Sequence, residues 1–487
     1  MKVRIKKLFI AAVFGLWLVN LAKAGLPEQI DNIISRPLQL KVRFSIHIVK
    51  ADSAATIYAH NENEPMIPAS NMKIVVTAAA LKYLGPNFIY KTKVGLCDDT
   101  LVIIGSGDPL LGDRVTDAGY NRDPNWIFKD IAESLKRNRV KTINNVIVDT
   151  TIFDDQRVHP NWPKEELNRW YACEVSALNF NCNCIEIGVK NINGKIIALL
   201  QPQTNFAKII NEVVPITQGD TAIGAYRNRQ PNGITLRGKC KDQVEPFPVA
   251  IEKPAVFFAF ILTEHLLKEG IKVKGNIIEK PLPDPANFKL LTEFFTPITD
   301  CLARCNKDSL GLAAEALLKT IAAHRNPNKK NGSWTRGQDL IHEFLLQLGI
   351  SENQFYIDDG SGLSRQNELS ASAITNILLS IYNSDNWNLY KNSFAVGGID
   401  GTIAKFFTEE KYKGKILGKT GYIQSVKAFS GVCTTADGDY IFSILTNNAN
   451  GQTRDAINDI AKLIYDSFEP QTPKIKTEPN EPSEPNN

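Results

Sequence analysis

Ser70 and Lys73 are the first residues of this sequence whose types and spacing could do chemistry. They lie in the segment PASNMK, where residues 71–84 are predicted to form a helix that ends before Pro86. Side chains three positions apart on a helix approach within roughly 5–6 Å at their β-carbons, so the lysine could take the proton of the serine. The free N–H groups of the helix start would favour a developing oxyanion. The alternative is a serine N-cap followed by an exposed lysine.

Lys419, Thr420 and Gly421 form a second candidate group, shortly before a strand predicted at residues 428–434. A cation and a hydroxyl on a strand edge could bind the terminal carboxylate of a peptide. The glycine would let the substrate backbone approach. The alternative is an ordinary turn between strands, so this motif alone is weak.

Joint occurrence in order makes the two motifs specific, because S-x-x-K and K-T-G are the outer motifs of penicillin-binding proteins and related β-lactamases. The chain resembles the class C low-molecular-mass penicillin-binding proteins, the D-alanyl-D-alanine carboxypeptidases and endopeptidases with a large insertion after S-x-x-K. The resemblance extends over residues 34–466. Supporting segments, each also readable as a turn, are GSGDP at 105–109, DTTIF at 149–153, SALN at 176–179, DGSGLS at 359–364 and GIDGT at 398–402.

The middle S-x-N motif departs from the family pattern. The matching stretch supplies Ser309 but has Gly311 where asparagine is expected. A literal S-D-N occurs at residues 384–386, but it follows DGSGLS instead of preceding it, and we interpret it as a chance loop. The asparagine amide would ordinarily contact the first lysine and the substrate backbone, so Gly311 predicts slowed catalysis unless water or a neighbouring side chain fills the gap.

The resemblance implies a serine-type peptidase that acts on D-alanyl-D-alanine peptides of peptidoglycan. Ser70 would be the nucleophile and Lys73 its base, while Ser309, assisted by Lys419, would protonate the leaving amine. No metal or organic cofactor is implied. Peptidoglycan stem peptides are the expected partners, and β-lactams are expected to acylate the nucleophile as inhibitors. The implied site residues are Ser70, Lys73, Ser309 and Lys419 for catalysis, Thr420 and Gly421 for substrate binding, and the backbone N–H groups of Ser70 and Tyr422 for the oxyanion.

Two other functions compete with this interpretation. A degenerate, non-catalytic peptidoglycan-binding protein is favoured by Gly311 and opposed by the intact outer motifs. A β-lactamase is opposed by the large insertion, since those enzymes are generally shorter. The sequence does not distinguish trimming of terminal D-alanine from cleavage of cross-links.

Residues 1–24 predict export to the periplasm. A basic stretch precedes an apolar run from residue 8 to 21, and Ala22-Lys23-Ala24 fits a cleavage site. The alternative is an uncleaved membrane anchor, and peripheral membrane association stays open. The segment carries five of the 56 basic residues and no acid, so the remainder is near neutral against 52 acidic residues and gives no reason to propose nucleic acid as a partner.

Cysteine and histidine residues predict structural roles rather than a metal site. Eight cysteines in an exported chain suggest disulfides, with buried thiols as the alternative. Cys182 and Cys184 have no histidine nearby, which argues against zinc. The six histidines match none of the motifs.

The expected fold is α+β, with an antiparallel sheet flanked by helices as in the serine β-lactamase and DD-peptidase domains. Strands at 43–50 and 56–59 form a predicted hairpin, as do strands at 428–434 and 440–446, and a helix follows at 453–468. One sheet closed by distant parts of the chain would make the middle an insertion. The expected division is a discontinuous catalytic domain at 25–96 and 289–468, an inserted, mainly β region of one or two small domains at 97–288, and a disordered tail at 469–487.

Overall fold

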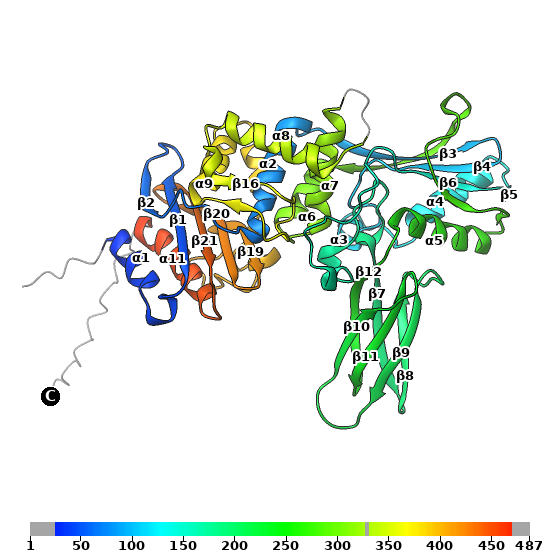
Figure 1. Ribbon diagram of the computed structural model, residues 1–487, viewed down its shortest axis with the longest axis horizontal. Helices are drawn as coiled ribbons and strands as arrows, with labels where there is room; N and C mark the ends of the chain where they lie inside the picture. Colours follow the sequence, from blue (N-terminus) through cyan, green and yellow to red (C-terminus); the bar gives the residue numbers. More distant parts are fainter. Residues whose placement is uncertain (1–24, 327–330, 470–487) are drawn as a thin grey trace, which may run out of the picture.

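The computed structural model describes residues 25–326 and 331–469 (Figure 1). The predicted leader at 1–24 and nearly all of the predicted tail at 469–487 therefore lie outside the described residues.

A six-stranded sheet joins the two ends of the described chain in the order β18-β19-β20-β21-β1-β2. β1 pairs antiparallel with β21, from Arg43 opposite Asn447 to Lys50 opposite Tyr440. The predicted single sheet, built from both ends of the chain, is confirmed. Its strands are β1 (Arg43–Lys50), β2 (Thr56–His60), β18 (Ala395–Val396), β19 (Ile416–Ile423), β20 (Val426–Thr435) and β21 (Gly438–Asn447).

Helices pack on both sides of this sheet. The terminal helices α1 (Leu26–Ile34) and α11 (Thr453–Phe468) pack against each other and share one apolar core with the sheet. A second core contains α2 (Met72–Leu84), in which residues 72–81 are all buried. A helix that is apolar all round belongs in the interior. The helices around α2 are α6 (Ile298–Asn306), α7 (Gly311–His324), α8 (Trp334–Gln347) and α9 (Ala371–Tyr382).

The middle of the chain forms a five-stranded sheet and two three-stranded sheets. In Figure 1 the five-stranded sheet lies to the right of the helices around α2, and the three-stranded sheets lie below it. β3 and β15 belong to the five-stranded sheet, so it extends past the predicted limits of 97 and 288 on both sides. The five strands are β3 (Ile89–Cys97), β4 (Thr100–Ile104), β6 (Val146–Asp149), β14 (Ile277–Glu279) and β15 (Lys289–Pro297). The smaller sheets contain β7 (Cys184–Ile192), β8 (Lys195–Gln201), β9 (Lys208–Pro215), β10 (Ala222–Arg227), β11 (Gly233–Cys240) and β12 (Gln243–Ala250).

Two longer helices accompany the five-stranded sheet. They are α4 (Trp126–Arg137), whose apolar residues follow a helical period, and α5 (Pro254–Lys268). Phe128 of α4 packs on Phe258 of α5 with ring centroids 5.4 Å apart. The remaining short elements are α3 (Arg114–Gly119), β5 (Thr142–Ile143), β13 (Lys272–Val273), β16 (Phe355–Tyr356), β17 (Glu368–Leu369) and α10 (Trp387–Lys391).

All eight cysteines are free thiols, so the predicted disulfides are absent from this structure and the buried-thiol alternative holds. Seven are buried, and Cys182 is partly exposed. Cys97, Cys240 and Cys433 belong to three different apolar clusters, which explains why they do not pair with one another. Across the described ranges, no helix has both the length and the apolar character needed to cross a bilayer.

Candidate active site

Ser70 lies in a short 3-10 turn, Ala69–Asn71, that leads directly into α2. The Lys73 Nζ atom is 3.1 Å from Ser70 Oγ and donates a 2.6 Å hydrogen bond to the carbonyl oxygen of Ser361. Lys73 is 2% exposed. The Asn71 amide donates to Ser430 Oγ on β20 at 2.6 Å, which ties the turn to the sheet. A nucleophile and a candidate base are thus in hydrogen-bond reach of each other.

The DGSGLS segment holds the Ser361 carbonyl against Lys73. The Glu315 carboxylate on α7 accepts hydrogen bonds from the backbone N–H groups of Gly360 at 2.9 Å and Ser361 at 2.7 Å. The Trp334 indole N–H donates to the same carboxylate at 2.7 Å. Glu315 is fully buried, and burial together with the neighbouring Asp359 raises its pKa.

Asp359 organises the rest of the same segment. Its carboxylate accepts hydrogen bonds from the backbone N–H groups of Gly362 at 2.7 Å and Ser364 at 2.8 Å. The Trp162 indole N–H, from the inserted region, donates to it at 2.8 Å. A β-carbon at Gly362 would lie 1.8 Å from the Ala69 carbonyl oxygen, so the segment lies directly against the Ser70 turn.

Lys419, Thr420 and Gly421 lie inside strand β19, which excludes the alternative of a turn between strands. Lys419 is fully buried, and its Nζ atom donates to the Thr420 carbonyl at 2.7 Å. The Thr420 hydroxyl lies 2.9 Å from the hydroxyl of Thr402. A β-carbon at Gly421 would lie 2.8 Å from the Pro68 carbonyl oxygen, so this glycine allows the strand to pack on the chain's own Ser70 turn. The Tyr422 side chain, next along the strand, is 70% exposed.

The two catalytic lysine candidates have lowered proton affinity. Burial lowers the pKa of Lys73 below its usual range, although Asp359 and Glu315 partly oppose the shift. Burial and the nearby charge of Lys73 lower the pKa of Lys419 well below its usual range. A lysine base must be neutral to accept a proton, so both shifts favour the chemistry expected here.

Ser309 lies in the short connection between α6 and α7, and its φ of 62° is in the left-handed region. Gly311 is the first residue of α7. A β-carbon at Gly311 would lie 3.1 Å from the Tyr171 carbonyl oxygen and 3.6 Å from the Ser361 β-carbon. Position 311, where asparagine was expected, is therefore crowded, because the backbone of Tyr171 in the inserted region lies against it.

The literal S-D-N at 384–386 forms a turn between α9 and α10. Ser384 Oγ donates to the Ile381 carbonyl at 2.7 Å and accepts from the Asn386 N–H at 3.3 Å. These are local contacts of a helix end, as expected for a chance match.

Several residues around the site were not singled out from the sequence. Glu315 and Trp334 act through the Ser361 segment, and no local pattern distinguishes them from other helix residues. The Arg454 guanidinium on α11 donates to the Gly421 carbonyl at 3.1 Å, and burial lowers its pKa to about 10. The Cys305 thiol lies near both lysines, and burial raises its pKa to about 12.

Comparison with known proteins gives one family and several distant relatives. The model of the D-Ala-D-Ala carboxypeptidase 3 (S13) family matches residues 26–466. A D-alanyl-D-alanine carboxypeptidase of Actinomadura sp. (strain R39) is 26% identical over 462 residues, covering 89% of this chain and 83% of that protein. The D-alanyl-D-alanine carboxypeptidase DacB of Haemophilus influenzae is 24% identical over 407 residues, covering 78% and 80%.

Solved structures agree on the fold. The crystal structure of penicillin binding protein 4 from Haemophilus influenzae superposes with a TM-score of 0.76 at 21% identity, covering 90% of this chain and 99% of that one. Its complex with a β-lactam gives a TM-score of 0.70 at 20% identity, covering 91% and 99%. The predicted α+β fold with inserted β domains is confirmed.

Replacement of Lys419 by methionine is expected to stabilise the protein. Because the folded state lowers the pKa of Lys419, the unfolded chain binds more protons, and wild-type stability falls as the pH drops below about 10.4. Lys419→Met removes this penalty, so the midpoint of thermal unfolding should rise, and by more at pH 6 than at pH 9. Replacement of buried ion pairs by apolar residues of similar volume stabilises proteins by up to about 1–4 kcal/mol, and we expect a gain of no more than this size.

Lys319 provides the control, because it is also fully buried and burial also lowers its pKa, but it pairs with Asp154 at 2.6 Å, and its removal leaves that carboxylate without its cation. Lys319→Met should lower the unfolding midpoint. A Lys419→Met protein that unfolds at a lower temperature than wild type at both pH values would contradict the argument.

Proposed function

This chain belongs to the D-Ala-D-Ala carboxypeptidase 3 (S13) family of serine-type carboxypeptidases, and we propose that it cleaves peptidoglycan stem peptides at D-alanyl-D-alanine bonds through an acyl-enzyme on Ser70. The observation that carries the proposal is the 3.1 Å approach of Ser70 Oγ and Lys73 Nζ in a buried setting that lowers the lysine pKa. This pair lies where the strand with Lys419 and the DGSGLS segment both pack on the Ser70 turn.

Acylation begins with neutral Lys73. Its Nζ donates one hydrogen to the Ser361 carbonyl, which leaves the nitrogen lone pair free to take the Ser70 proton. Ser70 Oγ then bonds to the carbonyl carbon of the penultimate D-alanine. The backbone N–H groups of Ser70 and Tyr422 are proposed to stabilise the oxyanion.

The C–N bond of the peptide then breaks. Ser309 gives its hydroxyl proton to the leaving amine and recovers a proton from the protonated Lys73, with Lys419 stabilising the transfer electrostatically. Thr420 is proposed to bind the substrate carboxylate. Water hydrolyses the Ser70 ester, which returns the free serine and releases the shortened peptide.

The Ser361 carbonyl is proposed to replace part of the missing asparagine. It accepts from Lys73 at 2.6 Å, and the Ser361 β-carbon lies 3.6 Å from the place of a β-carbon at position 311. The lysine thus keeps an acceptor that orients it toward Ser70, and Gly311 does not by itself imply a degenerate binding protein.

Gly311→Asn is therefore expected not to raise the acylation rate. The new side chain would start 3.1 Å from the Tyr171 carbonyl oxygen, a backbone atom that cannot easily move. We expect an unchanged or lower rate of penicillin acylation, measured by stopped-flow fluorescence, with Gly311→Ala as the control for crowding alone. An acylation rate that rises tenfold or more in Gly311→Asn would show that the glycine reduces the activity of the site.

Labelling with a fluorescent penicillin tests the proposed function directly. The Haemophilus influenzae protein has been crystallised with a β-lactam, and we propose that β-lactams also acylate Ser70 here. Wild type should carry the label on Ser70 by mass mapping, and Ser70→Ala should carry none. Ser384→Ala, in the chance S-D-N, is the matched control and should label like wild type. Label retained by Ser70→Ala, or absent from folded wild type, would refute the assignment.

The pH dependence of acylation follows from the lowered pKa of Lys73. Because only neutral lysine accepts the serine proton, the acylation rate constant should rise with pH and level off below about pH 10.4, the ordinary lysine pKa. Rates are measured by rapid mixing between pH 5 and 10, with circular dichroism to confirm folding at each pH. A rate that is still rising steeply at pH 10, with no sign of levelling off, would exclude Lys73 of lowered pKa as the base.

Both trimming of terminal D-alanine and cleavage of cross-links fit the proposed chemistry, since both break a bond on the carbonyl side of D-alanine. Chromatography of products from purified peptidoglycan fragments separates the two. We further propose export to the periplasm, which rests on the leader-like composition of residues 1–24.

A further inference from the structure

Ser309, the proposed proton donor, has an unusual backbone that something must hold in place. Its φ of 62° is one that residues other than glycine, asparagine and aspartate rarely adopt. Such conformations persist when surrounding contacts over-determine them, and they cluster at functional sites. The contacts on either side of Ser309 therefore identify what holds its backbone.

Both neighbours of Ser309 are tied to a single residue, Arg304, on the last turn of α6. The Arg304 guanidinium donates through Nη1 to Asp308 Oδ2 at 2.7 Å. The Arg304 carbonyl accepts the backbone N–H of Leu310 at 3.0 Å. One side chain and one main-chain group of Arg304 thus fix the loop immediately before and after the serine.

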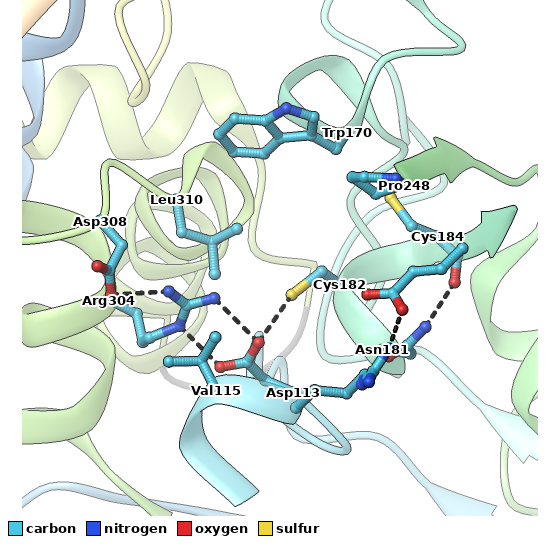
Figure 2. Close-up of a pocket in the computed structure, with 12 residues that line it drawn as sticks. Asp113, Val115, Trp170, Asn181, Cys182, Cys184, Pro248, Arg304, Asp308 and Leu310 are labelled. Atoms are coloured by element: carbon cyan, nitrogen blue, oxygen red, sulfur yellow. Dashed lines mark hydrogen bonds and ion pairs between the residues drawn. The ribbon is translucent and has the colours of Figure 1, made fainter. Parts of the chain in front are cut away.

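Arg304 is itself fixed from the inserted region. Its Nε and Nη2 atoms donate to the two carboxylate oxygens of Asp113 at 2.7 Å and 3.0 Å, a fork-to-fork pair. Figure 2 shows the guanidinium between Asp113 on one side and Asp308 on the other. The Asp113 side chain is 3% exposed and that of Arg304 is 14% exposed, so solvent screens this pair little.

Asp113 is in turn held rigidly at the start of α3. Its carboxylate caps the helix by accepting the Thr116 N–H at 3.1 Å and the Thr116 hydroxyl at 2.6 Å. The Cys182 thiol donates to it at 3.2 Å, a contact also visible in Figure 2. Burial opposes ionisation of Asp113, but Arg304 and these hydrogen bonds together hold its pKa below the usual range. The carboxylate is therefore a fixed charge.

We infer that Arg304 is a positioning residue that, through its pair with Asp113, holds Ser309 in the left-handed conformation needed for proton transfer to the leaving group. The inserted region then sets the geometry of the proton donor. This inference rests on the proposed function, because it assigns a role within the acylation of Ser70.

A double-mutant cycle on acylation tests the inference. We expect Arg304→Met to slow acylation of the full chain by a fluorescent penicillin by roughly 10-fold to 100-fold, since small misplacements of a catalytic group have effects of this size. The concentration of penicillin giving half the maximal rate should change little. In a Ser309→Ala background, the same Arg304→Met change should alter the rate less than about twofold, because the group that Arg304 positions is already gone.

Companion variants separate positioning from folding. Tyr120→Phe removes another hydrogen bond between the end of α3 and α6, the 2.8 Å bond to Asp300, and should acylate like wild type. If Arg304→Met does not fold, Asp308→Asn is used instead, because it weakens only the tie before Ser309. The lysine of Arg304→Lys cannot form the two parallel hydrogen bonds to Asp113, so this variant should acylate at a rate between those of wild type and Arg304→Met.

The outcomes are distinct. Arg304→Met that acylates at the wild-type rate, or slows equally with and without Ser309, overturns the positioning role. Wild type that is folded but never labelled overturns the proposed function and this inference together. If Arg304→Met slows acylation only in proteins that retain Ser309, the proposed function and the positioning role are both supported.

Discussion

The site depends on keeping two lysine side chains buried without a carboxylate partner. Lys73, Lys319 and Lys419 are all among the large fully buried side chains. Lys319 pairs with Asp154 at 2.6 Å, whereas in the described part of the chain neither Lys73 nor Lys419 has a carboxylate within ion-pair distance. Burial of an unpaired ammonium is unfavourable, so the protein binds these protons weakly. The chemistry proposed for Ser70 depends on this weak proton binding.

Close backbone packing keeps Lys73 and Lys419 buried. Gly362 lies against the Ala69 carbonyl and Gly421 against the Pro68 carbonyl, at places where a β-carbon would come within 3 Å of an oxygen. Two segments distant in sequence thus close directly over the Ser70 turn. Glycine in K-T-G and in DGSGLS is required here by the chain's own packing, a simpler reason than room for a substrate.

Local patterns predicted much of this molecule, and long-range contacts account for the rest. The terminal hairpins and the helix α11 follow from alternating and helical periods, and the spacing of Ser70 and Lys73 needs only one helical turn. The roles of Glu315 and Arg304 depend on partners 46 and 191 positions away, Ser361 and Asp113, so no local signal reveals them. The disulfide prediction failed because an even cysteine count says nothing about where the thiols lie.

The inserted region contacts three segments that lie next to proposed site residues. The Trp162 indole binds Asp359 in the segment that holds Lys73 in place, the Tyr171 carbonyl covers Gly311, and Asp113 binds Arg304 next to Ser309. A module that only widened a peptide groove would need none of these contacts. Since a β-carbon at position 311 would lie 3.1 Å from the Tyr171 carbonyl oxygen, the altered middle motif and the insertion pack directly against each other. Substitutions at position 311 therefore need to be judged together with the insertion that covers it.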